Sequence, residues 1–600
     1  MSDIIIDRIK ELRFLMDKHQ LSAYIIPSSD PHLSEYVADH WKLREWISDF
    51  TGSAGTVVVL GNKAGLWTDS RYYLQAAEQL KGTGIELFKD SLTETPSFID
   101  WICSEVTSGS TVGIDGEMFS ISHVEAMREK LEAANLTLKT DVSLINDEWA
   151  ELPPLPKTET FLLENKYTGK GIQDKLKEIR LEISKKRCHL LLLSALDEIS
   201  WTFNLRSSDI EYNPVIIAFA LISQDSAYLF TNKEKLTDKA FSELSQCNVT
   251  IIEYHNIYHN IYKVLSEIPA RMKILIDKDK TNYSLYNSIQ HKESVVFCPS
   301  PVILMKAVKN ETELNGVHNA MIKDGIALTE AFCELEKEVK KGNFISEMEF
   351  AERLKARRAA QPDFFCESFG TIAGYGPHGA IVHYSATKGS NVKIKDDNLL
   401  LVDSGANYFD GTTDITRTFS FGTPTEKQKH DYTNVLKGHI ALASIHFPKG
   451  TRGSQLDVLA HQYLWNEGLT YGHGAGHGIG HFLCVHEGPQ NIRPNDNGVK
   501  LQEGMLLSNE PGLYRTNEYG IRIENMILVQ KSFKSDDFGE FLCFETLTLF
   551  PYDRTLIDKK LLTNKEIEWI NNYHQTVFSK LGPLLSTKYR DWLKTKTQTI

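Results

Sequence analysis

The segment Leu399-Leu-Leu-Val-Asp403 decides the fold of the C-terminal half, because it is an apolar run of strand length that ends in a carboxylate. A turn-rich stretch, 404–411, follows it, and an extended pattern resumes in Thr412-Thr-Asp414-Ile-Thr-Arg417. Two strands joined by such a turn predict a hairpin. We therefore expect Asp403 and Asp414 to face one another across it.

A second pair of acids repeats this arrangement about 100 residues downstream. Met505-Leu-Leu-Ser-Asn-Glu510 is another strand that ends in a carboxylate. In Ile521-Arg-Ile-Glu524 apolar and charged residues alternate, so that Arg522 and Glu524 share one face of a strand. The four acids are thus predicted to lie on two hairpins.

Each of the four acids taken singly is an ordinary turn residue, whereas the four together predict a metal site. Carboxylates flanked by buried strand residues must be paired or bound to metal to offset their desolvation. Basic neighbours are too few for four carboxylates, and two divalent cations supply four positive charges against these four negative ones. The sequence therefore predicts a pair of divalent metal ions.

A glycine-rich segment lies between the two pairs of acids, Tyr471-Gly-His-Gly-Ala-Gly-His477-Gly-Ile-Gly-His481, and Val485-His486-Glu487 follows it. Histidines 473, 477 and 481 have the spacing of a zinc site on a helix. The five glycines argue against a helix, because each costs about 1 kcal/mol there. We expect instead that these glycines let a substrate backbone approach closely.

Composition narrows the class of protein. The chain has 600 residues, of which 41% are hydrophobic and 24% charged, as in ordinary globular proteins. Its net charge of −13 gives no basic surface for nucleic acid. No stretch has the length of a membrane span, and the N-terminus predicts an amphipathic helix instead of a signal peptide. Eight scattered cysteines without a CxxC pair indicate reduced thiols and a cytoplasmic location.

Proline-rich segments divide the chain into three predicted domains. The candidate linkers are Pro153–Thr158 and Pro299–Pro301, which give domains 1–152, 153–302 and 303–600. Segment 66–74 of the first domain is echoed by segment 228–236 of the second, which predicts two α/β domains related by duplication. A strand is predicted over 215–222 in the second copy.

The third domain combines these strands with helices and is predicted to be α+β. Helix starts are predicted at Asn310, Ser346, Ser454 and Thr563 by capping-box patterns, and at Thr423-Pro424 by the proline.

The five residues Asp403, Asp414, His477, Glu510 and Glu524 resemble the dinuclear site of the pita-bread metallopeptidases, the family of methionine aminopeptidase, prolidase and aminopeptidase P. Residue types, order and approximate spacing all match. Further similarity to the three-domain cytosolic aminopeptidase P enzymes lies in Asp30-Pro-His-Leu-Ser-Glu-Tyr36, Phe50-Thr-Gly-Ser-Ala-Gly55, Thr68-Asp-Ser-Arg71 and the segment after Ser300. The resemblance implies two related N-terminal α/β domains followed by a C-terminal pita-bread catalytic domain.

This resemblance also implies an activity, the release of the first residue from peptides with proline in second position. Asp403 would bind one metal ion, His477 and Glu510 the other, and Asp414 and Glu524 would bridge both. A hydroxide shared by the two ions would be the nucleophile. Because the ligands are mostly carboxylates, Mn²⁺ is the expected metal. Prolidase activity, on X-Pro dipeptides, and a non-catalytic peptide-binding module are the alternatives; the latter is disfavoured because all five ligands are present.

Other residues match family positions that act on substrate. Glu510 is the expected proton shuttle, and His383 and His486 are expected, with His477, to contact the substrate or the transition state; a structural imidazole is the alternative for His383 and His486. Arg71 matches an arginine that reaches the substrate, or forms an ordinary ion pair. His473 flanks the site, and His481 is expected to be structural. Arg522 either orients Asp403 or is a surface charge. The related enzymes are homodimers, and we expect a homodimer here.

Overall fold

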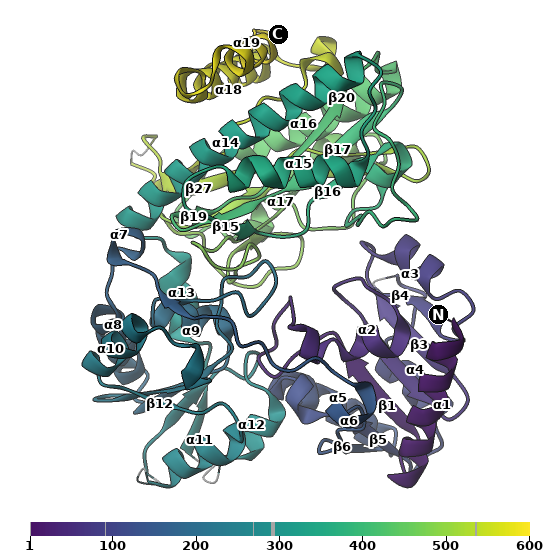
Figure 1. Cartoon of the computed structure of the whole chain (residues 1–600), viewed down its shortest axis with the longest axis vertical. Helices are drawn as coiled ribbons and strands as arrows, with labels where there is room; N and C mark the ends of the chain where they lie inside the picture. Colours follow the sequence, from purple (N-terminus) through teal and green to yellow (C-terminus); the bar gives the residue numbers. More distant parts are fainter. Residues whose placement is uncertain (1, 91, 268, 270, 290–293, 535–536) are drawn as a thin grey trace. The chain divides into compact units, whose positions relative to one another are not determined.

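The computed structural model of the protein describes residues 2–90, 92–267, 269, 271–289, 294–534 and 537–600. The chain divides into two units, Met1–Glu164 with Lys170–Ile303 and Asn165–Gly169 with Leu304–Ile600 (Figure 1). Among the described residues, no helix combines the length and the apolar content needed to cross a membrane.

The first unit contains two six-stranded sheets with the same topology. The strands of one sheet are β1 (Ala23–Pro27), β2 (Thr56–Leu60), β3 (Ala64–Thr68), β4 (Glu86–Lys89), β5 (Thr111–Ile114) and β6 (Thr137–Lys139). Those of the other are β8 (Leu190–Leu193), β10 (Phe219–Ser223), β11 (Ala227–Phe230), β12 (Val249–Ile252), β13 (Ile274–Ile276) and β14 (Val295–Phe297). A small two-stranded sheet pairs β7 (Phe161–Leu162) with β9 (Leu205–Arg206).

The strand orders are β4-β3-β2-β1-β5-β6 and β12-β11-β10-β8-β13-β14. In each sheet the second, third and fourth strands of this order pair antiparallel with one another, and all other neighbours pair parallel. Since order and sense agree strand by strand, the prediction of two related α/β domains is confirmed.

The helices of the first unit connect and cover these strands (Figure 1). They are α1 (Ser2–Lys18), α2 (Leu43–Ser48), α3 (Tyr73–Gln79), α4 (Phe98–Glu105), α5 (Ile121–Ala133), α6 (Asp147–Ala150), α8 (Ile172–Lys185), α9 (Leu196–Thr202), α10 (Asp238–Gln246), α11 (Ile257–Ser266) and α12 (Tyr283–Asn287). Helix α13 (Pro301–Ala307) leads into the second unit.

The strand predicted over 215–222 is shorter in the structure and begins only at Phe219. Before it, the amide of Ile216 donates to Ser200 Oγ and that of Ile217 to Asp209 Oδ2. These amides bond to side chains instead of a neighbouring strand, so the apolar run 215–218 is buried without being part of the sheet.

The second unit is the pita-bread domain, with short antiparallel sheets packed against long helices (Figure 1). Its strands are β15 (Phe364–Glu367), β16 (Ile372–Tyr375), β17 (Leu399–Ser404), β18 (Ala406–Tyr408), β19 (Gly411–Thr412), β20 (Ile415–Ser420), β21 (His446–Pro448), β22 (Gly476–His477), β23 (Asn491–Ile492), β24 (Leu506–Asn509), β25 (Gly512–Arg515), β26 (Tyr519–Arg522), β27 (Asn525–Lys531) and β28 (Phe541–Thr546). Its helices are α7 (Asn165–Thr168), α14 (Glu311–Lys340), α15 (Glu347–Ala359), α16 (Glu426–Ala443), α17 (Asp457–Trp465), α18 (Asn564–Leu581) and α19 (Thr587–Lys596).

Helix starts in this unit agree with the sequence in three places and differ in two. Asn310, Ser346 and Thr563 cap α14, α15 and α18 as predicted. Helix α16 starts two residues late, because Thr425 and Gln428 form its capping box. Ser454 caps nothing: its hydroxyl donates to Asp496, and α17 begins after Leu456.

Candidate metal centre

Strands β17 and β20 carry the first pair of acids. They pair antiparallel with Asp403 opposite Thr416, and Asp414 directly precedes β20. Alternate residues Leu400 and Val402 of β17 belong to the core beneath α14 and α15. Asp403 therefore lies on the other face of the strand.

Strands β24 and β27 carry the second pair. Asn509 pairs with Asn525, so Glu510 follows one strand and Glu524 precedes the other. The two pairs are joined at Thr416, whose carbonyl accepts from the amide of Glu524 at 3.0 Å and whose hydroxyl donates to Glu524 Oε2 at 2.7 Å. The four acids thus meet at one place, although they come from two separate sheets.

The glycine-rich segment passes beside these strands without forming a helix, which excludes the helical zinc site. His477 lies on β22, and its amide donates to Ser508 Oγ at 2.9 Å. Two of the neighbouring glycines are required by packing within the chain, and the approach of a substrate backbone to the segment stays a prediction. A Cβ at Gly476 would lie 2.2 Å from the carbonyl oxygen of Ser508, and one at Gly478 2.0 Å from that of Glu487. These glycines permit close packing of the chain on itself.

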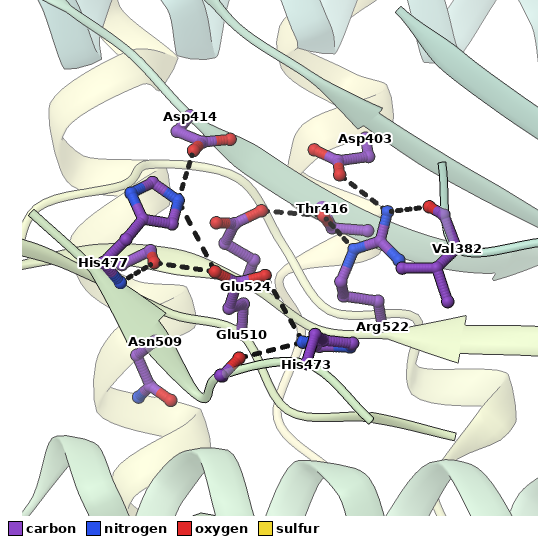
Figure 2. A network of polar contacts seen from close by, with 12 residues as sticks. Val382, Asp403, Asp414, Thr416, His473, His477, Asn509, Glu510, Arg522 and Glu524 are labelled. Carbon is purple, nitrogen blue, oxygen red and sulfur yellow. Dashed lines mark hydrogen bonds and ion pairs between the residues drawn. The ribbon is translucent and has the colours of Figure 1, made fainter. Parts of the chain in front are cut away.

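The His477 ring is oriented towards the carboxylates (Figure 2). Its Nδ1 lies 2.9 Å from the carbonyl oxygen of Gly478, which can only accept, so Nδ1 carries the proton. Its Nε2 lies 3.4 Å from Asp414 Oδ2 and 3.5 Å from Glu510 Oε1. A backbone carbonyl that fixes one ring nitrogen and leaves the other free for a cation is the usual environment of a metal-binding histidine.

The geometry of these side chains fits a cation. Asp414, His477 and Glu524 each offer a ligand atom, and these atoms lie within 4.8 Å of one another. Asp403 directs Oδ2 to Arg522, while its other oxygen, Oδ1, is buried and has no hydrogen-bond partner among the described residues. A buried carboxylate oxygen without a donor is costly, and a divalent cation would satisfy it.

The pKa values of the acids also indicate that a bound cation would stabilise the site. Burial raises the pKa of Glu524 well above its usual value, and the charge of Asp414 adds to this effect. Burial likewise raises the pKa of Asp403 and of Glu510, although Arg522 and His477 oppose it. Without a further cation, carboxylates gathered here retain protons.

Arg522 is buried and holds Asp403, so the predicted ion pair is confirmed and the surface-charge alternative is wrong. Its Nη1 donates to Tyr514 OH at 2.6 Å, and that hydroxyl also contacts His473 Nε2 at 2.7 Å. The sequence did not single out Thr416 or Tyr514. Period-two alternation was a usable signal for Thr416, since it lies two residues beyond Asp414 on the same strand face.

The remaining predicted site residues are placed as follows. The rings of His486 and His477 are in edge contact, with centroids 4.4 Å apart. His383 follows Val382, whose carbonyl accepts from Arg522 Nη2 at 3.3 Å. His481 is buried beside Gly316 of α14, as expected for a structural residue.

Arg71 belongs to the other unit, where it forms a bidentate ion pair with Asp69. The ion-pair alternative is thus observed for Arg71, and its contact with substrate stays a prediction.

Four carboxylates and an imidazole that are gathered on a pita-bread fold are the arrangement of a metallopeptidase. The model of metallopeptidase family M24 matches residues 317–531, and the model of its C-terminal region matches 540–600. Models of the creatinase/prolidase N-terminal domain match 8–145 and 151–313. The chain belongs to family M24.

Its relatives include Xaa-Pro aminopeptidase 1 of Dictyostelium discoideum, 39% identical over 99% of this chain and 96% of that protein. A probable Xaa-Pro aminopeptidase P of Sordaria macrospora is 41% identical over 98% of both chains. Among solved structures, X-prolyl aminopeptidase of Caenorhabditis elegans, described as a cytosolic enzyme with a di-nuclear active site, matches with a TM-score of 0.96. It is 34% identical and covers 99% of this chain and 100% of its own.

Proposed function

We propose that this protein is a dinuclear metal-dependent aminopeptidase that releases the N-terminal residue from peptides with proline in second position. One observation carries the proposal: the ligand atoms of Asp414, His477 and Glu524 converge within 4.8 Å. They do so in a chain that matches Xaa-Pro aminopeptidases over nearly its full length.

The proposed ligands are the five residues identified from the sequence. Asp403 would hold one metal ion, and His477 and Glu510 the other, with Asp414 and Glu524 shared between them. When bound, two divalent ions supply an activated water and polarise the scissile carbonyl. We propose Mn²⁺ because the donors are four carboxylates and one imidazole. Activity and metal content after reconstitution with Mn²⁺, Zn²⁺, Co²⁺ or Mg²⁺ test this choice.

Glu510 is the proposed proton carrier. Its Oε1 accepts from Ser508 Oγ at 3.0 Å and lies 3.5 Å from His477 Nε2, while Oε2 lies 3.8 Å from His473 Nδ1. A carboxylate beside the reacting atoms can receive a proton and return it to the leaving nitrogen. His383, His477 and His486 are the proposed substrate-binding imidazoles, and His383 and His486 would act with Glu510 in the reaction. Arg71 is a further proposed substrate-binding residue, on the basis of the resemblance.

A comparison of three peptides tests the function. With Mn²⁺, the purified protein should release the first residue of an X-Pro-Y tripeptide and barely cleave an X-Ala-Y control. Faster cleavage of the dipeptide X-Pro would identify a prolidase instead. If the wild-type protein hydrolyses none of the peptides and holds no more metal than Asp414→Ala, it would be a binding module. The matched control is Asp410→Asn, because Asp410 is a buried acid that pairs with Lys323 at 2.9 Å and binds no proposed metal.

Further proposals concern the setting of the enzyme. We propose the domains 1–152, 153–302 and 303–600, supported by the separate sheets of residues 23–139 and 190–297. A cytoplasmic location is supported by eight free thiols and by the cytosolic relative from C. elegans. The homodimer rests on the resemblance, and sedimentation velocity tests it.

A further inference from the structure

We propose that Glu347 is a positioning residue that holds the loop carrying His383 in place for catalysis. The proposal rests on the proposed function, in which His383 contacts the substrate. Glu347 is the first residue of α15, and its side chain is fully buried. A carboxylate at this end of a helix is favoured by the helix dipole.

The Glu347 carboxylate accepts from four donors, all of them in segment 375–392. Oε1 lies 2.8 Å from the amide of Tyr375 and 2.8 Å from His378 Nδ1. Oε2 lies 3.0 Å from Tyr384 OH and 3.2 Å from the amide of Val392. One side chain thus ties together the beginning, the middle and the end of the loop that contains His383.

The backbone beside Glu347 fixes the end of the same loop. The amide of Glu347 donates to the carbonyl of Val392 at 3.1 Å, and that of Ile394 donates to Ile345 at 2.8 Å. The amide of Met348 donates to Asn391 Oδ1 at 3.1 Å. These bonds secure residues 391–394 without the Glu347 carboxylate, so its other contacts act on the part of the loop nearer to His383.

His383 lies between two tethered neighbours. The carbonyl of Val382 accepts from Arg522, which also holds Asp403 at 2.6 Å (Figure 2). On the other side, the hydroxyl of Tyr384 donates to Glu347, and the ring of Tyr384 stacks on that of His378 at 4.4 Å. The backbone of His383 is therefore held between the metal centre and α15.

Loss of this carboxylate would leave several donors of a partly buried loop without an acceptor. Relaxation of the loop would move His383, and a displacement near 1 Å can lower turnover by about 100-fold. The proposed metal ligands lie outside this loop, on β17 and β22 or directly beside the ends of β20, β24 and β27. The proposal therefore predicts loss of activity without loss of metal.

A double-mutant cycle with His383→Ala tests this inference on the full-length protein loaded with Mn²⁺ and assayed with an X-Pro-Y tripeptide. Glu347→Ala should lower kcat/KM by about 10- to 100-fold in the wild-type background and by less than about 2-fold in the His383→Ala background. Glu347→Gln, which keeps one acceptor oxygen, should lose less. Metal content should stay at the wild-type value in each variant.

The matched control is Asp324→Asn, because Asp324 is a buried acid that binds Arg358 at 2.8 Å and accepts from Tyr408 OH at 3.2 Å, both outside segment 375–392. Its effect should be equal in both backgrounds. Equal losses from Glu347→Ala in both backgrounds would overturn the positioning role, while peptide hydrolysis by the wild type would still support the function. A wild-type protein without peptidase activity would overturn both. If Glu347→Ala does not fold, Glu347→Gln and Tyr384→Phe give the same cycle.

Discussion

Arg522 Nη2 and Asp403 Oδ2 lie 2.6 Å apart, and the two side chains are 2% and 12% exposed. The same guanidinium donates to Tyr514 OH, to Thr416 Oγ1 at 3.1 Å and to the carbonyl of Val382. Four groups from four segments are therefore oriented by one arginine. Because Asp403 Oδ2 is fixed in this way, Oδ1 is left as the oxygen that can face a cation.

Replacement of this arginine by lysine should separate charge from geometry. Arg522→Lys keeps the positive charge but loses the planar fork, so Asp403 should be oriented less well. We expect metal affinity and turnover to fall by about 10- to 100-fold. Arg515→Lys is the matched control, since Arg515 makes a bidentate pair with Asp431 outside the site. Equal metal content in the two variants would contradict the orienting role.

Glu510 and His481 should differ in their effect on turnover when each is replaced by alanine. Glu510→Ala removes a proposed ligand and the proposed proton carrier, so nearly all turnover should be lost. His481→Ala changes a buried residue packed near Gly316, and we expect most of the activity to remain, with some loss of stability. Steady-state kinetics together with thermal unfolding check this ranking. Similar losses of kcat would show that the ranking of the segment is wrong.

Removal of metal should make stability depend on pH. In the metal-free protein, burial raises the pKa of Glu524, Asp403 and Glu510. Burial alone would lower the pKa of His477, but its contact with Asp414 and the charge of Glu510 raise it to about 9. The folded state thus binds protons more tightly than the unfolded state does. Proton binding by these groups therefore stabilises the folded state. This stabilisation is fully present below the pKa that each group has in the unfolded chain, and it is lost as pH rises through the pKa of the folded state.

For His477 this window extends from about 6.5 to about 9. We expect the melting temperature of chelated protein to fall across this range, and that of metal-loaded protein to fall less, because the cations replace the protons. In chelated Asp414→Asn the melting temperature should depend less steeply on pH, since His477 loses its charged partner. A chelated protein whose melting temperature is constant from pH 6 to 9 would contradict the prediction.

Strand alternation and residue type are local signals, and they predicted the strands and singled out the four acids, whereas His477 was singled out by the resemblance to the pita-bread metallopeptidases. The sequence did not predict Thr416, Tyr514 or Glu347, whose partners lie on other elements. The same limit explains the wrong cap at Ser454, which matched a local pattern while its hydroxyl bonds to a distant aspartate. Hydrogen bonds between elements depend on the packing of the strands and are not encoded in spacing along the chain.

The C-terminal region should contribute to the stability of the metal centre through Arg417. This buried side chain donates to the carbonyl of Glu524 at 2.6 Å and to Tyr573 OH at 2.9 Å, and its guanidinium lies 4.6 Å from the centre of the Tyr552 ring. Tyr573 lies on α18 and also donates to the carbonyl of Phe550 at 2.9 Å. Helix α18 is thus linked to the strand end that carries Glu524.

Tyr573→Phe removes the hydroxyl and leaves the ring in the core, so we expect a loss of about 1–3 kcal/mol of unfolding free energy. Metal affinity should fall as well, because Arg417, which binds the carbonyl of Glu524, loses its hydrogen bond to the Tyr573 hydroxyl. The matched control is Tyr589→Phe, since Tyr589 is a partly buried tyrosine whose hydroxyl bonds to Glu334 at 2.6 Å, away from the metal centre. Denaturant unfolding and metal titration measure the two effects. Unchanged metal affinity in Tyr573→Phe, with stability lowered, would restrict the C-terminal helix to a packing role.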